Sequence, residues 1–203
     1  MTLPHEDKAA APKNKPPKER KIKVPKKISA RYLYNSGLAY LQRFPASTHH
    51  FRGVMMRKIQ KSCRHHTDQN MEECQKLLEE TISQFKELGL LDDAAYLKGM
   101  VTSFRRRGLS STQIGLKLQQ KGYDSAAVKN ELQKYDRDEF QSEANGDYHA
   151  ALIFARKKRL GPFDTDNRKT PEKSLAAMAR AGYSFDVAKK ILNISLEEVE
   201  NGF

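Results

Sequence analysis

The sequence has little of what disulfide-stabilised and membrane proteins require. Its 203 residues include only two cysteines, Cys63 and Cys74. Two cysteines do not build a disulfide framework in a chain of this size, which favours a reduced, cytosolic protein. No apolar run approaches the roughly 20 residues of a membrane span. The N-terminus carries lysines but no apolar signal-peptide core, so we expect a cytoplasmic protein without a membrane partner.

Signatures of catalysis and of cofactor binding are also missing. The sequence has no glycine-rich phosphate-binding loop and no nucleophile elbow. One stretch is rich in histidine and cysteine, and mixed sets of these residues can hold zinc, but it contains no CxxC or HxxxH pair. The set consists of His49, His50, Cys63, His65, His66 and Cys74. Surface histidines and half-buried cysteines explain it better, and we expect no enzyme activity, no cofactor and no metal.

What the chain does have is positive charge, with a net charge of +12 and a pI of about 9.6. Half of that charge lies in residues 1–27, which hold nine Lys/Arg, three Asp/Glu and five of the eight prolines. Proline opposes helix formation and apolar side chains are too few for a core, so we predict a disordered basic tail at residues 1–27. The tail either serves solubility alone or contacts phosphates as a salt-sensitive basic arm.

From Ile28 onward the spacing of apolar residues is helical, as in the series that begins with Leu78 and Ile82. No alternating run of β-branched residues is long enough to predict a strand. Asp92 and Asp93 stand just ahead of one predicted helix, which favours N-capping over metal or acid–base chemistry. The SLEE stretch near the C-terminus is a capping-box pattern that predicts one short final helix.

A glycine–tyrosine phrase occurs twice, as QKGYDSAAVKNEL and as RAGYSFDVAKKIL. Gly122 and Gly182 suit the left-handed position that often follows a helix. Asp124 is placed to cap the next helix, and Tyr123 to pack on Val128 as a hydrophobic staple. Stacking of the tyrosines on exposed bases is the alternative use of these rings. The phrase therefore predicts the start of a helix at each copy.

The similarity of the two copies extends upstream, to a helix that ends in a basic cluster, a break and a second helix. We therefore predict an all-α protein in which three tandem three-helix repeats form an elongated, curved array, and we expect a monomer. The predicted parts are repeats at 28–89, 90–136 and 137–194 and a short C-terminal helix or tail at 195–203. The first repeat is the loosest copy and carries a polar insertion at about 61–75.

The stretch ELGLLDDAAYLKGMVTSFRRRG resembles the centre of the RecX family of bacterial recombination regulators. LSSTQIGLKLQQKGYDSAAVKNEL is similar to the second unit of that family, and ALIFARKKRLG with SLAAMARAGYSFDVAKKIL is similar to its third. The resemblance covers about Ser29 to Leu192, with the stretch KSCRHHTDQNMEECQ as an addition. It implies a curved, all-helical protein that binds the RecA recombinase filament on single-stranded DNA and restrains its ATPase and strand exchange.

Basic residues recur at the end of the first helix in the second and third predicted repeats, and on the helix that follows the first of these clusters. We predict contacts with the partner or with nucleic acid at these positions. They are Arg105, Arg106, Arg107, Lys117, Lys121, Arg156, Lys157, Lys158 and Arg159. Charge at a helix C-terminus also stabilises the macrodipole, but that needs one or two cations, and three or four in a row repel one another unless an anionic partner is present.

The residues and the resemblance together predict a non-enzymatic regulator that binds RecA filaments on single-stranded DNA and inhibits them. Two other functions fit the same composition. One is a helical repeat protein that binds nucleic acid without a recombinase partner. The other is a scaffolding protein whose charge serves only solubility.

Overall fold

The computed structural model describes residues 24–140, 146–166 and 168–201, and within these ranges the chain is all-helical. Ten α-helices and one short 3-10 helix follow one another, without a strand in the described ranges. The all-α prediction is therefore confirmed. Over the same residues, no helix is both long enough and apolar enough to cross a membrane. Residues 1–23, most of the predicted disordered tail, lie outside the described residues.

Helices α1, α2 and α3 enclose the first of three hydrophobic clusters. They span Ala30–Leu41, Thr48–His65 and Met71–Glu87. The centre of this cluster is aromatic, because Phe51 and Phe85 are fully buried with their ring centroids 5.6 Å apart. A Cβ at Gly37 would lie 2.7 Å from Phe85, so α1 approaches this closely only because residue 37 lacks a side chain.

Helices α4, α5 and α6 enclose the second cluster. They span Asp93–Arg106, Ser111–Gln119 and Ser125–Phe140. Val101, Ile114 and Leu118 are fully buried in it. The carboxylate of Asp92 accepts a hydrogen bond of 2.9 Å from the backbone N–H of Ala95, which confirms its predicted role as the N-cap of α4.

The remaining helices enclose the third cluster. They are α7 (Gly146–Lys158), the 3-10 helix η2 (Gly161–Phe163), α8 (Pro171–Arg180), α9 (Phe185–Asn193) and α10 (Leu196–Asn201). Buried alanines on α7, among them Ala151 and Ala155, let neighbouring helices pack closely. At α10, the N–H of Ser195 donates to the Glu198 carboxylate at 2.9 Å and the N–H of Glu198 donates to Ser195 Oγ at 3.1 Å. This reciprocal pair confirms the predicted capping box.

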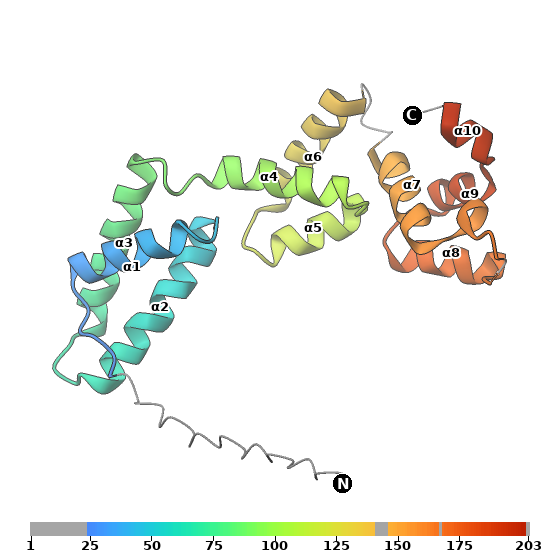
Figure 1. The fold of residues 1–203 in the computed structure, drawn as a ribbon. Coiled ribbons are helices and arrows are strands. Elements are labelled where there is room, and N and C mark those ends of the chain that lie inside the picture. The colour runs from blue at the N-terminus through green and yellow to red at the C-terminus, as the bar shows by residue number, and fades with distance from the viewer. Residues whose placement is uncertain (1–23, 141–145, 167, 202–203) are drawn as a thin grey trace, which may run out of the picture.

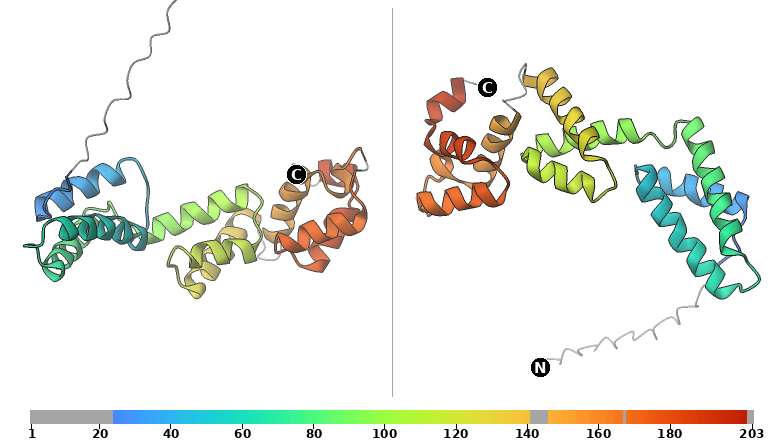
Figure 2. Two further views of the ribbon diagram at one scale, coloured as in Figure 1. Left: turned by 90° about the horizontal axis from the view of Figure 1, so that it is seen from below. Right: turned by 180° about the vertical axis from the view of Figure 1, so that it is seen from behind.

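The three groups of helices, α1–α3, α4–α6 and α7–α10, follow one another along the molecule (Figure 1). The two further views in Figure 2 show the same order, with α4 leading from the first group into the second. The apolar core is thus divided into three clusters. Contacts between neighbouring groups therefore decide how the groups are oriented.

The glycine–tyrosine phrase forms two turns of the predicted kind. Gly122 and Gly182 have φ angles of 87° and 81°, in the left-handed region that glycine favours. After the first turn, the carboxylate of Asp124 accepts from the N–H of Ala126 at 2.9 Å, and after the second, Ser184 Oγ accepts from the next helix in the same way. The left-handed glycines of both copies and the predicted cap at Asp124 are therefore confirmed.

The tyrosines of these turns reach beyond their own helices. The hydroxyl of Tyr123 donates to the carbonyl of Asp93 at 3.1 Å, and that of Tyr183 donates to the carbonyl of Gly108 at 2.8 Å. Burial raises the pKa of both hydroxyls, so they remain protonated donors. Tyr183 is only 5% exposed, which leaves its ring no access to a nucleic-acid base.

The structure shows what the predicted polar insertion at 61–75 looks like. Helix α2 continues to His65 and α3 begins at Met71, so most of this stretch is helical and belongs to these two helices. Asn70 makes the early start of α3 possible, because its side chain accepts from the second N–H of that helix at 2.8 Å. The last residues of the predicted tail are also fixed, since Ser62 Oγ donates to the carbonyl of Lys26 at 2.9 Å.

The turn at Gly182 gives a test by substitution. Gly182→Ala is expected to lower the free energy of unfolding by about 1–2 kcal/mol, because alanine is strained in the left-handed backbone conformation. The loss should exceed this value, because the added Cβ would also lie 2.7 Å from the buried Ser110 Oγ. Gly99→Ala is the matched control, because it lies inside α4 with nothing within 4 Å of a Cβ and should raise stability by about 0.5–1 kcal/mol. Urea denaturation followed by circular dichroism measures both, and equal effects would contradict this description of the turn.

Candidate nucleic-acid interface

The first and second helical groups meet at the N-terminus of α2. The backbone N–H of Thr48, the first residue of α2, donates to the carboxylate of Asp93, the first residue of α4, at 2.7 Å. A carboxylate is favourable there because the N-terminus of a helix carries partial positive charge. Beside this contact Gly122 lies against His49, where a Cβ would be 2.7 Å from the imidazole ring. The two contacts bring α2 next to the end of α5.

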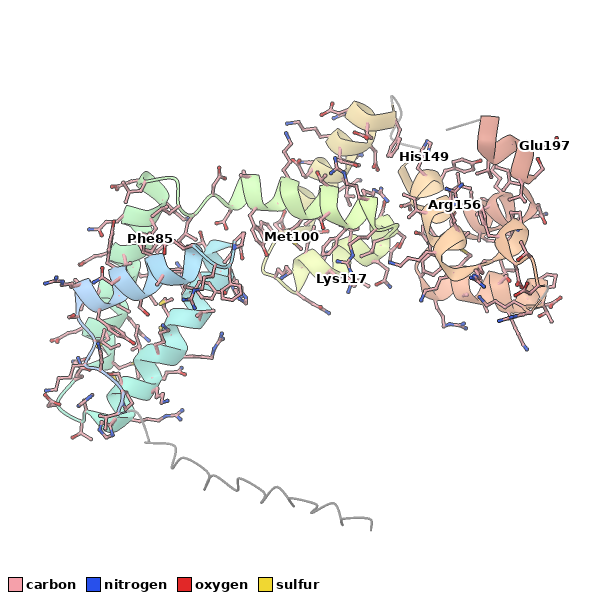
Figure 3. The ribbon with its side chains drawn as sticks, in the orientation of Figure 1. Phe85, Met100, Lys117, His149, Arg156 and Glu197 are labelled. Atoms are coloured by element: carbon pink, nitrogen blue, oxygen red, sulfur yellow. The ribbon has the colours of Figure 1, made fainter. Side chains whose placement is uncertain are left out.

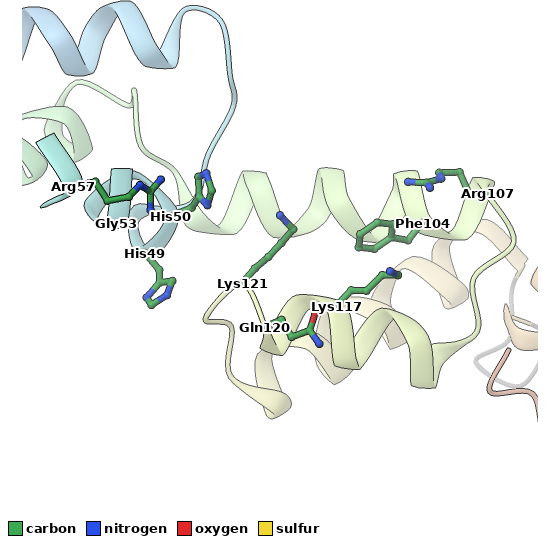
Figure 4. A pocket seen from close by; sticks show the side chains of 9 residues that line it. All are labelled: His49, His50, Gly53, Arg57, Phe104, Arg107, Lys117, Gln120 and Lys121. Carbon is green, nitrogen blue, oxygen red and sulfur yellow. The ribbon is translucent and has the colours of Figure 1, made fainter. Parts of the chain in front are cut away.

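A cleft of about 500 Å³ lies beside this junction, with α2 on one side and α4 and α5 on the other. Figure 4 shows Lys117 and Lys121 on the α5 side and Gly53 and Arg57 on the α2 side. The full lining consists of His49, His50, Gly53, Arg57, Phe104, Arg107, Lys117, Gln120 and Lys121. The walls of the cleft therefore belong to two different helical groups.

The lining of this cleft is cationic. Arg57, Arg107, Lys117 and Lys121 contribute four positive charges, and none of the described residues that line it is acidic. Lys121 is half-buried and the other three are exposed. Because like charges gathered in one hollow raise the local positive potential, the site is chemically suited to an anionic ligand.

Three of the nine predicted contact residues, Arg107, Lys117 and Lys121, line this cleft together, and the α2 side of it was not predicted. His49, Gly53 and Arg57 follow one another at intervals of four residues, which places them on one face of α2. That spacing is readable in the sequence. The sequence does not predict that this face of α2 lies opposite α5, because α5 begins about sixty residues further along the chain.

The structure contradicts the predicted surface role of Arg105. This side chain is buried, and its guanidinium donates to both oxygens of the Asp136 carboxylate, at 3.0 and 2.6 Å, and to Asp147 Oδ1 at 2.6 Å. Its remaining hydrogen bonds reach the carbonyl of Leu109 and the hydroxyl of Ser111. Two carboxylates neutralise the charge and the donors are occupied. Arg105 therefore joins α4, α6 and α7 and is not available to a partner.

The other two arginines of the same cluster are exposed but lie on different sides. Arg107 lines the cleft, with its guanidinium carbon 5.9 Å from the centroid of the Phe104 ring. Arg106 lies near Tyr135 on α6, where burial and the charge of Glu139 raise the pKa of the tyrosine hydroxyl and Arg106 opposes the rise. The run of three arginines thus divides among a buried ion cluster, the cleft and the α6 surface.

The second predicted cluster is exposed at the end of α7, in the third helical group. Figure 3 labels Arg156 in this group, apart from Lys117 on α5 in the second group. Its members are Arg156, Lys157, Lys158 and Arg159. The guanidinium carbon of Arg156 lies 5.5 Å from the centroid of Phe163. Arg159 has a φ of 50° and is the one non-glycine residue with positive φ in the described ranges. This cluster does not contribute to the lining of the cleft.

Comparison with known proteins gives relatives over most of the chain. It is 36% identical over 182 residues to Regulatory protein RecX of Myxococcus xanthus, covering 87% of this chain and 92% of that protein. It is 30% identical over 169 residues to Regulatory protein RecX of Agrobacterium fabrum, covering 82% and 85%, and 30% identical over 122 residues to the protein of that name from Streptomyces coelicolor, covering 59% and 61%. No protein-family model and no solved structure matches the chain.

The buried ion cluster around Arg105 can be tested by comparing the stability of an Arg105 variant with that of a variant at the neighbouring Arg106. Arg105→Ala is expected to lower the free energy of unfolding by about 3 kcal/mol, because it removes the guanidinium that donates to both oxygens of the buried Asp136 carboxylate. This is the lower end of the usual range, since the Asp147 side chain is 29% exposed to solvent. Arg106→Ala removes the same charge from the surface and should change stability by less than about 0.5 kcal/mol. Urea denaturation compares the two, and a similar loss in both variants would contradict the assignment.

Proposed function

The chain belongs to the RecX family of regulatory proteins, and we propose that it regulates the RecA recombinase by binding the filament that RecA forms on single-stranded DNA. In this proposal it acts in the cytoplasm as a monomer and without catalysis. It lowers the rates of ATP hydrolysis and of strand exchange by the filament. The cationic cleft contacts phosphates of the DNA, and the exposed Arg106 and the cluster Arg156–Arg159 contact the same filament.

The observation that supports this proposal best is the composition of the cleft. Arginine presents a planar fork that matches two phosphate oxygens, and lysine provides a compact point charge for one. Arg57 and Arg107 supply the first kind of contact and Lys117 and Lys121 the second. Because these residues come from two helical groups, a bound strand would also hold the groups in one relative orientation.

We also propose that the three helical groups are copies of one repeat, and the junctions between them support this. At the first junction the N–H of Thr48 donates to Asp93, and at the second the N–H of Ser111 donates to Asp147, each at 2.7 Å. Each donor is the first residue of the middle helix of its group and follows a serine N-cap. Each acceptor stands at the start of the first helix of the next group.

The glycine turns support the same equivalence. A Cβ at Gly122 would meet His49, and one at Gly182 would meet Thr112, and both neighbours are the second residues of a middle helix. The third group breaks the pattern. Its middle helix begins with Pro171, which has no N–H to donate to a further aspartate. The third group therefore lacks the N–H that makes this type of junction in the first two groups.

The different environments of the two basic clusters agree with this scheme. The ends of α4 and α7 are closed by equivalent backbone hydrogen bonds. The N–H of Leu109 donates to the carbonyl of Phe104, and the N–H of Leu160 donates to the carbonyl of Ala155. Arg105 and Arg156 directly follow these acceptors and therefore occupy matching positions. Arg105 is covered by the group that follows it. Arg156 is exposed, so it is available to a partner.

The proposal is tested by ATP hydrolysis in a mixture of RecA, single-stranded DNA and ATP, titrated with this protein. The wild-type chain should lower the rate. The double variant Arg107→Glu/Lys117→Glu should need about tenfold more protein for the same effect, because two charge-assisted contacts of 1.5–3 kcal/mol each are lost in part. Its affinity for the DNA alone should also depend less on salt, with the slope smaller by about 1.4 for two phosphates.

The matched control is Lys129→Glu/Lys134→Glu, which makes the same change of charge at exposed positions on α6 outside the cleft. It should inhibit as the wild type does. If the wild-type protein leaves ATP hydrolysis unchanged, the proposed function is refuted. Binding of single-stranded DNA without any effect on RecA would instead identify a nucleic-acid-binding protein that has no recombinase partner.

A further inference from the structure

The two cysteines of the chain face each other across α2 and α3. The Sγ atoms of Cys63 and Cys74 are 4.0 Å apart, and both residues are free thiols. Cys63 lies in the last turn of α2 and is half-buried, whereas Cys74 lies in the first turn of α3 and is 3% exposed. Only residues 66–70 separate the two helices, so a short corner of the chain sets this distance.

Hydrogen bonds to the segment ahead of α1 hold this corner. The side-chain amide of Gln69 donates to the carbonyl of Ile28 and accepts from its N–H, both at 3.0 Å. Ser62, next to Cys63, donates to the carbonyl of Lys26 at 2.9 Å, and a ring nitrogen of His66 lies 2.8 Å from the carbonyl of Pro25. The two sulfur atoms are therefore kept in contact by a braced part of the fold.

The surroundings of the pair favour chemistry between the sulfurs over metal binding. The described ranges hold no group of three or more His, Cys, Asp or Glu side chains that could bind a metal ion. Burial raises the pKa of the Cys74 thiol to about 11, so this thiol stays protonated at neutral pH. Cys63 is the more exposed of the two residues, and we expect it to meet a dissolved oxidant first.

We propose that Cys63 and Cys74 form a reversible intramolecular disulfide, with a hydroperoxide or a small-molecule disulfide as the oxidant. With hydrogen peroxide, the Cys63 thiolate attacks one oxygen, the O–O bond breaks, and the departing hydroxide takes a proton to form water. The Cys74 sulfur then attacks the sulfur of the resulting sulfenic acid. The S–O bond breaks, and the hydroxyl group leaves with the Cys74 proton as a second water. A thiol reductant reverses the reaction and is itself oxidised to a disulfide.

The geometry requires little rearrangement for this step. The sulfurs are 4.0 Å apart and must approach by about 2 Å to reach bonding distance, and both belong to terminal turns of their helices. Because Cys74 belongs to the first hydrophobic cluster, the bond would link two of the helices that enclose that cluster. It would restrict the unfolded chain, and the melting temperature of the oxidised protein should rise by about 5 °C.

The test uses the full-length protein, first reduced and freed of reductant, then treated with hydrogen peroxide or with oxidised glutathione. Intact mass spectrometry should show the loss of two hydrogen atoms per chain, and peptide mapping should identify a bond between Cys63 and Cys74. Both changes should be reversed by dithiothreitol. The oxidised product should remain a monomer in gel filtration.

Two single variants serve as controls. Cys63→Ser and Cys74→Ala should each lose the mass change of two hydrogens. In Cys74→Ala the remaining Cys63 should instead carry one glutathione or cross-link to a second chain, whereas the buried Cys74 of Cys63→Ser should stay largely unmodified. The wild-type result does not depend on how well these variants fold. A wild-type protein whose main products are glutathione adducts, sulfinic acids or disulfide-linked dimers would overturn the proposal, and so would one that keeps both thiols under these oxidants.

Discussion

The structure depends on a carboxylate at the start of one helix that accepts the first backbone N–H of a helix in the preceding group. Asp93 makes this contact with Thr48, and Asp147 makes it with Ser111. The apolar core is divided into three clusters, one in each helical group. Apolar packing within a cluster does not by itself set the orientation of the next group. A charge-assisted hydrogen bond at a helix N-terminus is directional, and it therefore fixes an orientation that apolar packing alone would leave loose.

Two features of functional interest follow from these junctions. The first junction brings α2 beside α5 and so creates the cationic cleft, whose walls would otherwise be two unrelated helix surfaces. The second junction places Asp147 against Arg105, which converts an arginine of a basic run into part of a buried ion cluster. The same type of contact thus decides which cations line the cleft and which one joins helices of the fold.

The features that the sequence predicts well are those that depend on interactions between residues close together in the chain. The all-α class, the left-handed glycines at 122 and 182, the N-cap at Asp92 and the capping box at Ser195 each depend on residues at most a few positions apart. Arg105 could not be assigned in this way. Its partners Asp136 and Asp147 lie 31 and 42 residues away, and nothing in a run of three arginines marks which one turns inward. The α2 wall of the cleft was missed for the same reason, because its partner surface on α5 is remote in sequence.

The measurement that tests this account most directly is the affinity of Asp93 variants for single-stranded DNA, determined by fluorescence anisotropy on proteins that circular dichroism shows to be helical. Asp93→Ala removes the acceptor that aligns α2 with the second group, and it also makes the protein more positive. The account predicts weaker binding for Asp93→Ala and nearly unchanged binding for Asp93→Asn, which keeps a carbonyl acceptor for the Thr48 N–H. Binding by Asp93→Ala as tight as that of the wild type, or tighter, would show that net charge alone governs the interaction and would contradict the account.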